Sequence, residues 1–153
     1  MRIACSLGSL LSVEEVIQCT ELVSKTGIDS IWIPETWGME NFSMLGAVAN
    51  KTKTQKIGSS IINIYSRSPS TIAMGSATTD TLSNGRLILG LGTSSVPIVE
   101  DFHGEKFENP VQRMREYVEI IRLSLMKKQI NYSGNIFNLK NFTLLIEPKR
   151  KSI

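Results

Sequence analysis

Two glycines and three hydroxyl residues follow one apolar stretch of this sequence and could together bind a ligand. The apolar residues 87–89 predict a short strand, and Gly90 and Gly92 follow it. Residues 93–95 then read Thr-Ser-Ser. Glycine lets a backbone approach a ligand closely, and N–H and O–H donors at a strand end are typical of ligand sites in α/β proteins. The stretch 85–104 therefore predicts a ligand-binding loop.

The same glycines also allow a dinucleotide-binding interpretation. That fingerprint requires a third glycine and a helix that opens at once. Here Ser95 stands at the third position, Pro97 follows it, and the next predicted helix begins only at Pro110. The dinucleotide interpretation is therefore the weaker alternative.

Three ionisable side chains close to predicted strand ends are candidates for chemistry. His103, the only histidine, could donate a proton because histidine titrates near neutrality, or it could make a structural hydrogen bond. Glu35 could act as an acid or anchor the entry of a helix. Arg67 could bind a phosphate or carboxylate of a cofactor, or hold its loop through a salt bridge. Glu35 and His103 are the candidate catalytic residues, and the alternatives stay open.

The elements that would position these residues alternate along the chain. The predicted strands are residues 2–6, 29–34, 56–61 and 86–89, and the predicted helices are residues 13–26, 42–52, 69–82 and 110–126. Alternation of this kind predicts a parallel sheet with right-handed crossovers. Either a doubly wound open sheet or a (β/α)8 barrel satisfies it. After residue 126, two short runs around Ser133-Gly134-Asn135 predict a β-hairpin over about residues 129–139.

Polar and apolar signals mark the ends and faces of these helices. Ser12 with Glu15 forms a capping box, and Ser68 precedes a proline at the first turn of the third helix. The fourth helix carries apolar residues at helical spacing, so we expect one buried stripe. Its members are Val111, Met114, Val118, Ile121 and Leu125.

Composition excludes several classes of function. The chain has 153 residues, 41% of them hydrophobic, and a net charge of +3 that lies largely in residues 149–151, so no nucleic-acid surface is indicated. Cys5 and Cys19 make no metal spacing or disulfide framework, and no run has the length of a transmembrane helix. We expect a cytoplasmic protein with a small-molecule substrate and without a metal, a nucleic acid or a membrane as partner.

Four segments in this order resemble the bacterial-luciferase-like superfamily. They resemble in particular its F420-dependent oxidoreductase branch, which includes methylenetetrahydromethanopterin reductase. Any one segment alone would be a weak signal, but the ordered combination is specific. The segments are residues 31–38 (IWIPETWG), 57–69 (IGSSIINIYSRSP), 83–95 (SNGRLILGLGTSS) and 99–122 (VEDFHGEKFENPVQRMREYVEIIR).

The resemblance implies the N-terminal half of a (β/α)8 TIM barrel, with four βα units and a short hairpin. We expect residues 1–153 to form one incomplete luciferase-like domain, since a whole barrel typically needs about 250 residues. A half-barrel leaves two open sheet edges. We therefore expect either aggregation or completion by a partner, as a homodimer or with a complementing C-terminal half.

The resemblance also implies a cofactor site at the carboxyl ends of the strands. A deazaflavin ring needs a flat apolar wall and a few donors, which Ile61 with Trp37 and Asn63 with Thr93 and Ser94 could supply. The family commonly has a non-proline cis peptide in its third strand, and the matching bond is Ser60–Ile61; a plain buried strand is the alternative. The expected cofactor-binding residues are Ser60, Ile61, Asn63, Gly92, Thr93 and Ser94.

The implied activity is hydride transfer between reduced coenzyme F420 and a small organic substrate. An FMN-dependent monooxygenase of the same fold and an inactive, partner-binding half-barrel are the alternatives. Some sugar-phosphate and alcohol dehydrogenases of the family use a histidine after the second strand and a glutamate after the fourth. Thr36 and Ser95 stand at about those places here, which argues against those particular dehydrogenations.

Overall fold

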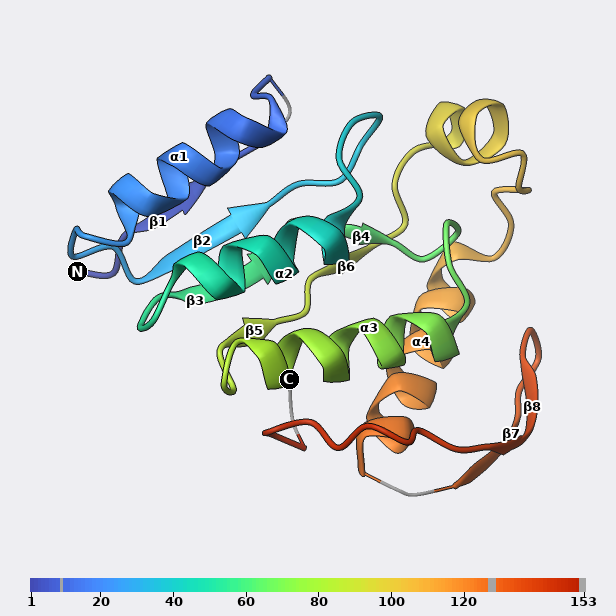
Figure 1. Cartoon of the computed structure of the whole chain (residues 1–153). Helices are drawn as coiled ribbons and strands as arrows, with labels where there is room; N and C mark the ends of the chain where they lie inside the picture. The colour runs from blue at the N-terminus through green and yellow to red at the C-terminus, as the bar shows by residue number, and fades with distance from the viewer. Residues whose placement is uncertain (9, 127–128, 152–153) are drawn as a thin grey trace.

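Four parallel strands form the main sheet, in the order β1-β2-β3-β5 (Figure 1). The computed structural model describes residues 1–8, 10–126 and 129–151. Each strand pairs in parallel with the next one along the chain, as the alternation predicts. This is the arrangement of half a (β/α)8 barrel, not that of a doubly wound sheet, in which the strand order reverses. The strands are β1 (Ala4–Ser6), β2 (Ser30–Ile33), β3 (Lys56–Ser59) and β5 (Leu87–Ile88).

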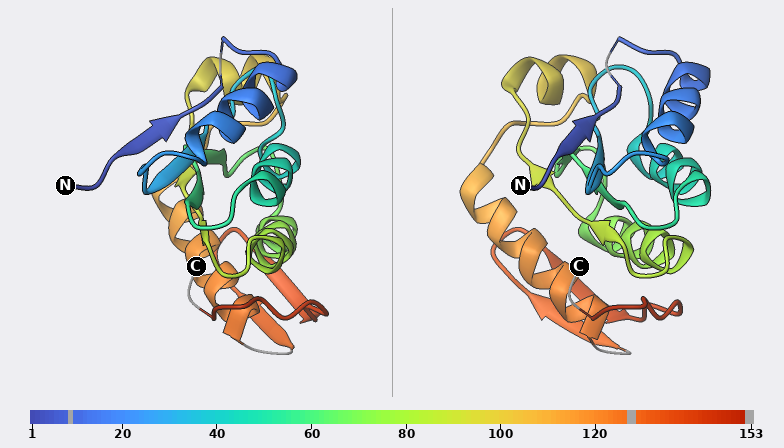
Figure 2. Two further views of the ribbon diagram at one scale, coloured as in Figure 1. Left: turned by 60° about the vertical axis from the view of Figure 1, so that its left-hand side comes forward. Right: turned by 90° about the vertical axis from the view of Figure 1, so that its left-hand side faces the viewer.

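Helices cover the outer side of this sheet, and Figure 2 shows them in an arc around it. The helices are α1 (Val13–Val23), α2 (Asn41–Lys51), α3 (Pro69–Leu82) and α4 (Pro110–Met126). The side chains of Ile31, Ile57 and Leu87 point to the helices and are fully buried with Val16 and Leu45. The capping box at Ser12 and the cap at Ser68 are confirmed. None of the helices in the described ranges is long and apolar enough to span a membrane.

Two strands of the sheet are interrupted and then continue. After β3 the chain forms β4 (Ile62–Asn63), and after β5 it forms β6 (Leu91–Gly92). These two short strands pair with each other in parallel, with Ile62 opposite Leu91 and Asn63 opposite Gly92. The predicted third and fourth strands are thus each broken in two, just where the cofactor site is expected.

The predicted stripe of α4 is wrong at its first position. Val111 is 72% exposed, whereas Tyr117, Ile121 and Leu125 are buried. The buried face is turned toward the start of α3, where Tyr117 donates a hydrogen bond to the Arg67 carbonyl over 2.6 Å, and toward the hairpin turn, where its ring meets the Phe137 ring edge to face. The spacing of apolar residues alone could not predict the polar contacts that orient α4.

The predicted hairpin is confirmed as an antiparallel pair, β7 (Ile130–Ser133) and β8 (Asn138–Phe142). Its turn is held by Glu116 of α4, whose residue surface is only 1% exposed. The Glu116 carboxylate accepts backbone N–H groups of Asn135 at 2.8 Å, of Ile136 at 3.1 Å and of Phe137 at 3.0 Å. A buried carboxylate thus fixes the hairpin to the helix.

The C-terminal segment returns to the sheet. Arg150 forms an ion pair with the fully buried Asp80 of α3 at 2.7 Å, and it also donates to the Leu87 carbonyl. Leu87 lies in β5, which is an edge strand of the main sheet. The segment 147–151 therefore contacts the β5 edge through Arg150. The charge of Arg150 is neutralised by Asp80 of the same chain.

Candidate cofactor site

The strand breaks are held together by one hydroxyl group. Ser59 Oγ donates to the Gly90 carbonyl at 2.9 Å and accepts the Gly90 N–H at 2.8 Å. A Cβ at position 90 would collide with the Ser59 carbonyl oxygen, so only glycine permits this approach. Beyond this contact, Ile62 N–H donates to the Gly90 carbonyl at 2.9 Å and the two strands continue.

Ile61 packs directly on the second glycine. A Cβ built on Gly92 would lie 2.6 Å from Ile61 Cδ1, so the absence of a side chain there makes room for Ile61. The Ser60–Ile61 peptide bond is cis, which confirms the expectation from the sequence. The Ile61 side chain is half-buried and offers an apolar surface at the carboxyl end of β3.

Asn63 carries an unpaired donor beside this surface. Its residue surface is 3% exposed, and its Oδ1 accepts the Tyr65 N–H at 3.0 Å. Its Nδ2 has no hydrogen-bond partner among the described residues. Leaving a buried donor unpaired costs about 1–3 kcal/mol, so an acceptor supplied by a ligand would offset that cost.

The loop after β6 places hydroxyl groups next to Gly92. Thr93 and Ser94 are both half-buried, and Ser94 takes a positive φ of 60°. Ser60, on the facing strand, is exposed and donates its N–H to the Ile33 carbonyl at 2.9 Å. The six expected cofactor-binding residues therefore lie on two facing strand ends, although their contacts with a cofactor stay a prediction.

Glu35 and Arg67 form an ion pair between two loops. Arg67 donates from Nη1 to Glu35 Oε2 at 2.8 Å and from Nη2 to Glu35 Oε1 at 2.5 Å, and it also pairs with Glu40. Glu35 Oε1 accepts the Asn41 N–H at 3.0 Å, at the start of α2. The hydrogen bond to Glu35 raises the pKa of Arg67 above its ordinary value. Glu35 thus anchors the start of α2, and Arg67 holds its loop through a salt bridge. Each of these roles was one of the two alternatives that the sequence left open.

His103 lies at the edge of a shallow cavity next to this ion pair. The cavity has a volume of about 230 Å³ and is lined by Trp37, Phe102 and His103 together with the ion-paired residues. His103 stacks at a tilt against Phe102, with 4.9 Å between ring centroids. Trp37 is 69% exposed and lies in this cavity, which Ile61 does not line. The predicted wall of Ile61 and Trp37 is therefore divided between two places.

Comparison with known proteins agrees with this geometry. A family model described as luciferase-like monooxygenase matches residues 1–153. The chain belongs to this family.

The luciferase-like relatives include oxidoreductases that depend on F420 or carry FMN. The 5,10-methylenetetrahydromethanopterin reductase of Archaeoglobus fulgidus is 36% identical over 129 residues, which cover 84% of this chain and 39% of the reductase. The coenzyme F420-dependent tetrahydromethanopterin reductase of Methanopyrus kandleri has a TM-score of 0.87 at 21% identity, over 97% of this chain and 47% of that one. An FMN complex of the oxygenating constituent of 3,6-diketocamphane monooxygenase from Pseudomonas putida has a TM-score of 0.83 at 17% identity, over 99% and 49%. The chain spans half or less of the length of these relatives and forms half of a luciferase-like barrel.

The residues of this luciferase-like chain fit a flavin-like ring. Ile61 on Gly92 supplies apolar surface, and Asn63 Nδ2 is a buried donor to which the described part of the chain offers no acceptor. Hydroxyl groups of Thr93 and Ser94 stand on the adjoining loop. Such a ring requires one flat wall and a small number of polar groups.

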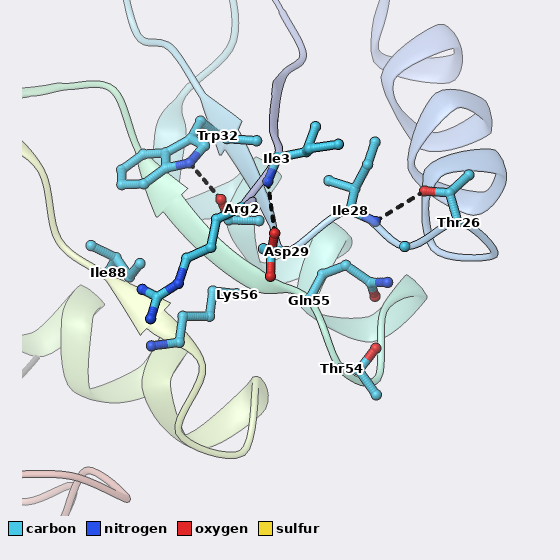
Figure 3. A pocket seen from close by; sticks show the side chains of 13 residues that line it. Arg2, Ile3, Thr26, Ile28, Asp29, Trp32, Thr54, Gln55, Lys56 and Ile88 are labelled. Atoms are coloured by element: carbon cyan, nitrogen blue, oxygen red, sulfur yellow. Dashed lines mark hydrogen bonds between the residues drawn. The ribbon is translucent and has the colours of Figure 1, made fainter.

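Sequence reasoning missed two features of the luciferase-like sheet. One is Ser59, which bridges the strand breaks; the neighbouring Gly90 was the available signal, because a glycine at a strand break often marks a close approach. The other is a cavity at the amino ends of the strands, seen in Figure 3. It was missed because ligands of barrels are expected only at the carboxyl ends.

Proposed function

We propose that this luciferase-like chain provides the cofactor-binding part of an oxidoreductase that moves a hydride between coenzyme F420 and a small organic substrate. The observation that carries the proposal is Ile61 seated on Gly92 beside the unpaired donor of Asn63. The relatives whose names state a dependence on coenzyme F420 favour F420 over FMN.

Each residue of the site has a defined part in this proposal. Ile61 would pack against the ring and keep water from one face of it. Asn63 would donate from Nδ2 to a ring oxygen, and Thr93 and Ser94 would add donors from the loop. The reduced deazaflavin supplies the hydride when bound, so the chain's own task is to hold and shield the ring.

Cofactor binding by the full chain tests the proposal. Equilibrium dialysis against F420, and separately against FMN, should show saturable binding with F420 bound more tightly. Gly92→Val should weaken binding at least tenfold, because the new side chain takes the place of Ile61. Gly27→Val is the matched control, since a Cβ at position 27 meets nothing within 4 Å.

A second variant tests the donor itself. Asn63→Asp keeps the oxygen that accepts the Tyr65 N–H but replaces the Nδ2 donor with an acceptor. A buried carboxylate without a partner also lowers stability, so binding is measured at a temperature where circular dichroism shows the variant folded, and we expect weaker cofactor binding there. A folded chain that binds neither cofactor would contradict the proposal and favour an inactive half-barrel, and tighter FMN binding would favour a monooxygenase.

A further inference from the structure

The shallow cavity that His103 lines lies where three loops at the carboxyl end of the sheet meet. Its walls are residues 35–40 after β2, residues 66–67 after β4, and the end of the helical turn η1 (Ile98–Phe102) with His103. Its volume is about 230 Å³. Pockets for drug-sized ligands have volumes of about 300–1,000 Å³, so this cavity suits a single ring system of a ligand.

Large aromatic side chains are exposed to solvent around this cavity. Trp37 is 69% exposed and Phe102 is 54% exposed, and the two come from different loops. The His103 ring stands at a tilt against Phe102, with 4.9 Å between the ring centroids, and extends the aromatic surface. Single exposed apolar side chains are ordinary on a protein, whereas several around one cavity mark a ligand site. A flat ring bound here would remove these side chains from water.

The charged groups of the cavity offer no unpaired cation to an anionic ligand. Arg67 is the one guanidinium among the described lining residues, and it pairs with both Glu35 and Glu40. Two carboxylates therefore face one cation, and the N-terminus of α2, which Glu40 caps, offsets part of the remaining negative charge. The Glu40 side chain is 46% exposed, so a phosphate or carboxylate entering the cavity would be repelled by it.

Hydrogen bonds connect this cavity to the expected cofactor site. Ser66 Oγ donates to the Asn63 carbonyl at 2.8 Å and accepts from Arg67 Nη1 at 3.1 Å. Asn63 is the residue whose buried Nδ2 is proposed to donate to the cofactor ring. A ligand in the cavity would therefore lie one hydrogen-bonded residue away from the cofactor site.

We propose that this cavity binds an aromatic ring of the organic substrate, and that this ring carries no negative charge. Calling the ligand a substrate rests on the proposed function, whereas the binding of such a ring rests on the cavity alone. Trp37 and Phe102 determine the preference for a ring, because they supply the aromatic surface. Glu40 determines the preference against anions.

Two naphthalene derivatives test the proposal on the full chain without a cofactor. Naphthylmethanol is neutral, whereas naphthyl phosphate carries the same ring system with a negative charge. Equilibrium dialysis should show saturable binding of naphthylmethanol and at least threefold weaker binding of naphthyl phosphate. Added salt should reduce the difference between the two, because it screens the repulsion by Glu40.

Variants of the lining residues assign this binding to the cavity. Trp37→Ala should weaken the binding of naphthylmethanol at least fivefold through lost stacking, and Phe102→Ala should weaken it in the same direction. Leu22→Ala is the matched control, because Leu22 is 66% exposed on α1 and does not line the cavity. Glu40→Gln should bring the affinities of the two probes together, since glutamine can still accept the Ser43 N–H but carries no charge. Circular dichroism shows that each variant is folded.

Three results would overturn the inference. A folded wild type that does not bind naphthylmethanol would show that the cavity holds no ring. Binding that is unchanged in both Trp37→Ala and Phe102→Ala would place the ring elsewhere. Naphthyl phosphate bound as tightly as naphthylmethanol, or more tightly, would assign the cavity to an anion.

Failure of this inference can be told apart from failure of the proposed function. A wild type that binds F420 but not naphthylmethanol would refute the ring site and leave the cofactor site intact. A wild type that binds naphthylmethanol but not F420 would refute the cofactor site and leave the ring site intact.

Discussion

The two ends of the sheet differ in whether their cationic side chains form ion pairs. At the carboxyl end, Arg67 is paired with Glu35 and Glu40 by the chain itself. At the amino end, Arg2 and Lys56 line a cavity in which the described residues offer them no ion pair. The Arg67 cation at the carboxyl end is thus paired within the chain, whereas the described residues offer no carboxylate partner to the two cations at the amino end. The following predictions test this difference, from the largest expected effect to the smallest.

Glu116 is the extreme case of a charge satisfied inside the chain. Glu116→Ala should lower the free energy of unfolding by about 3 kcal/mol or more, because three buried backbone N–H groups lose their acceptor. The shift of the urea midpoint measures it. Arg115→Ala, an exposed change on the same helix, should stay within about 0.5 kcal/mol of the wild type. Equal losses in the two variants would contradict the role of Glu116 as the hairpin anchor.

Breaking the ion pair at the carboxyl end should cost less, but still clearly. Arg67→Met leaves the Glu35 side chain, which is 11% exposed, without its cation, and we expect a loss of about 2–3 kcal/mol in unfolding free energy. Lys51→Met is the control, because its pair with Glu21 has side chains 45% and 47% exposed, so its unfolding free energy should stay close to that of the wild type. If thermal melts of the two variants coincide, the carboxyl end is not held by its own charges.

The pH dependence of stability should report on Glu116. Burial alone would raise the pKa of this carboxyl, but hydrogen bonds from Gln112 and from the backbone N–H groups of the hairpin lower it overall. Its contribution is therefore fully present above the ordinary pKa of 4.5 and is lost as the pH falls through the lower folded value. Glu116→Gln should cost about 1–2 kcal/mol at pH 7 and flatten the stability curve on the acid side. An acid limb as steep as that of the wild type would contradict this assignment.

At the amino end, removal of a cation should cost almost nothing. Lys56→Met takes away one of two like charges in the cavity, so the unfolding free energy should change by no more than about 0.5 kcal/mol. The measurement is the same urea titration as for Arg67→Met, which makes the two ends directly comparable. A loss as large as that of Arg67→Met would mean that Lys56 has a partner within the chain.

The sequence predicted the fold more completely than the site. The apolar runs at 29–34 and 56–61, with helices between them, were enough for a parallel sheet, because buried strands and capped helices leave local signals. The family that the order of motifs indicated is confirmed by the family model that matches residues 1–153. Boundaries at Gly90 and after Ser59 were not predicted, since a strand break depends on a contact between residues 31 positions apart.

The charged residues show where local reasoning stops. Nothing in the stretch around Glu35 reveals that Arg67, 32 residues later, pairs with it. Val111 was expected to be buried because its spacing suits a stripe, yet Tyr117 and Glu116 determine which face of α4 turns inward. Polar contacts between distant parts of the chain determine which of these residues are paired or buried. Such contacts produce no periodic pattern in the sequence.

The two tryptophans of the chain can serve as fluorescence probes, one at each end of the sheet. Trp32 forms the floor of the amino-end cavity, and Trp37 lies in the cavity beside Arg67. Because an indole responds to the polarity around it, Trp37→Phe would leave an emission signal that reports on the inner face alone. Trp32→Phe would leave one that reports on the loop beside the ion pair. Emission spectra of the two variants, recorded side by side, would thus show whether an added molecule binds at one end of the sheet or at the other.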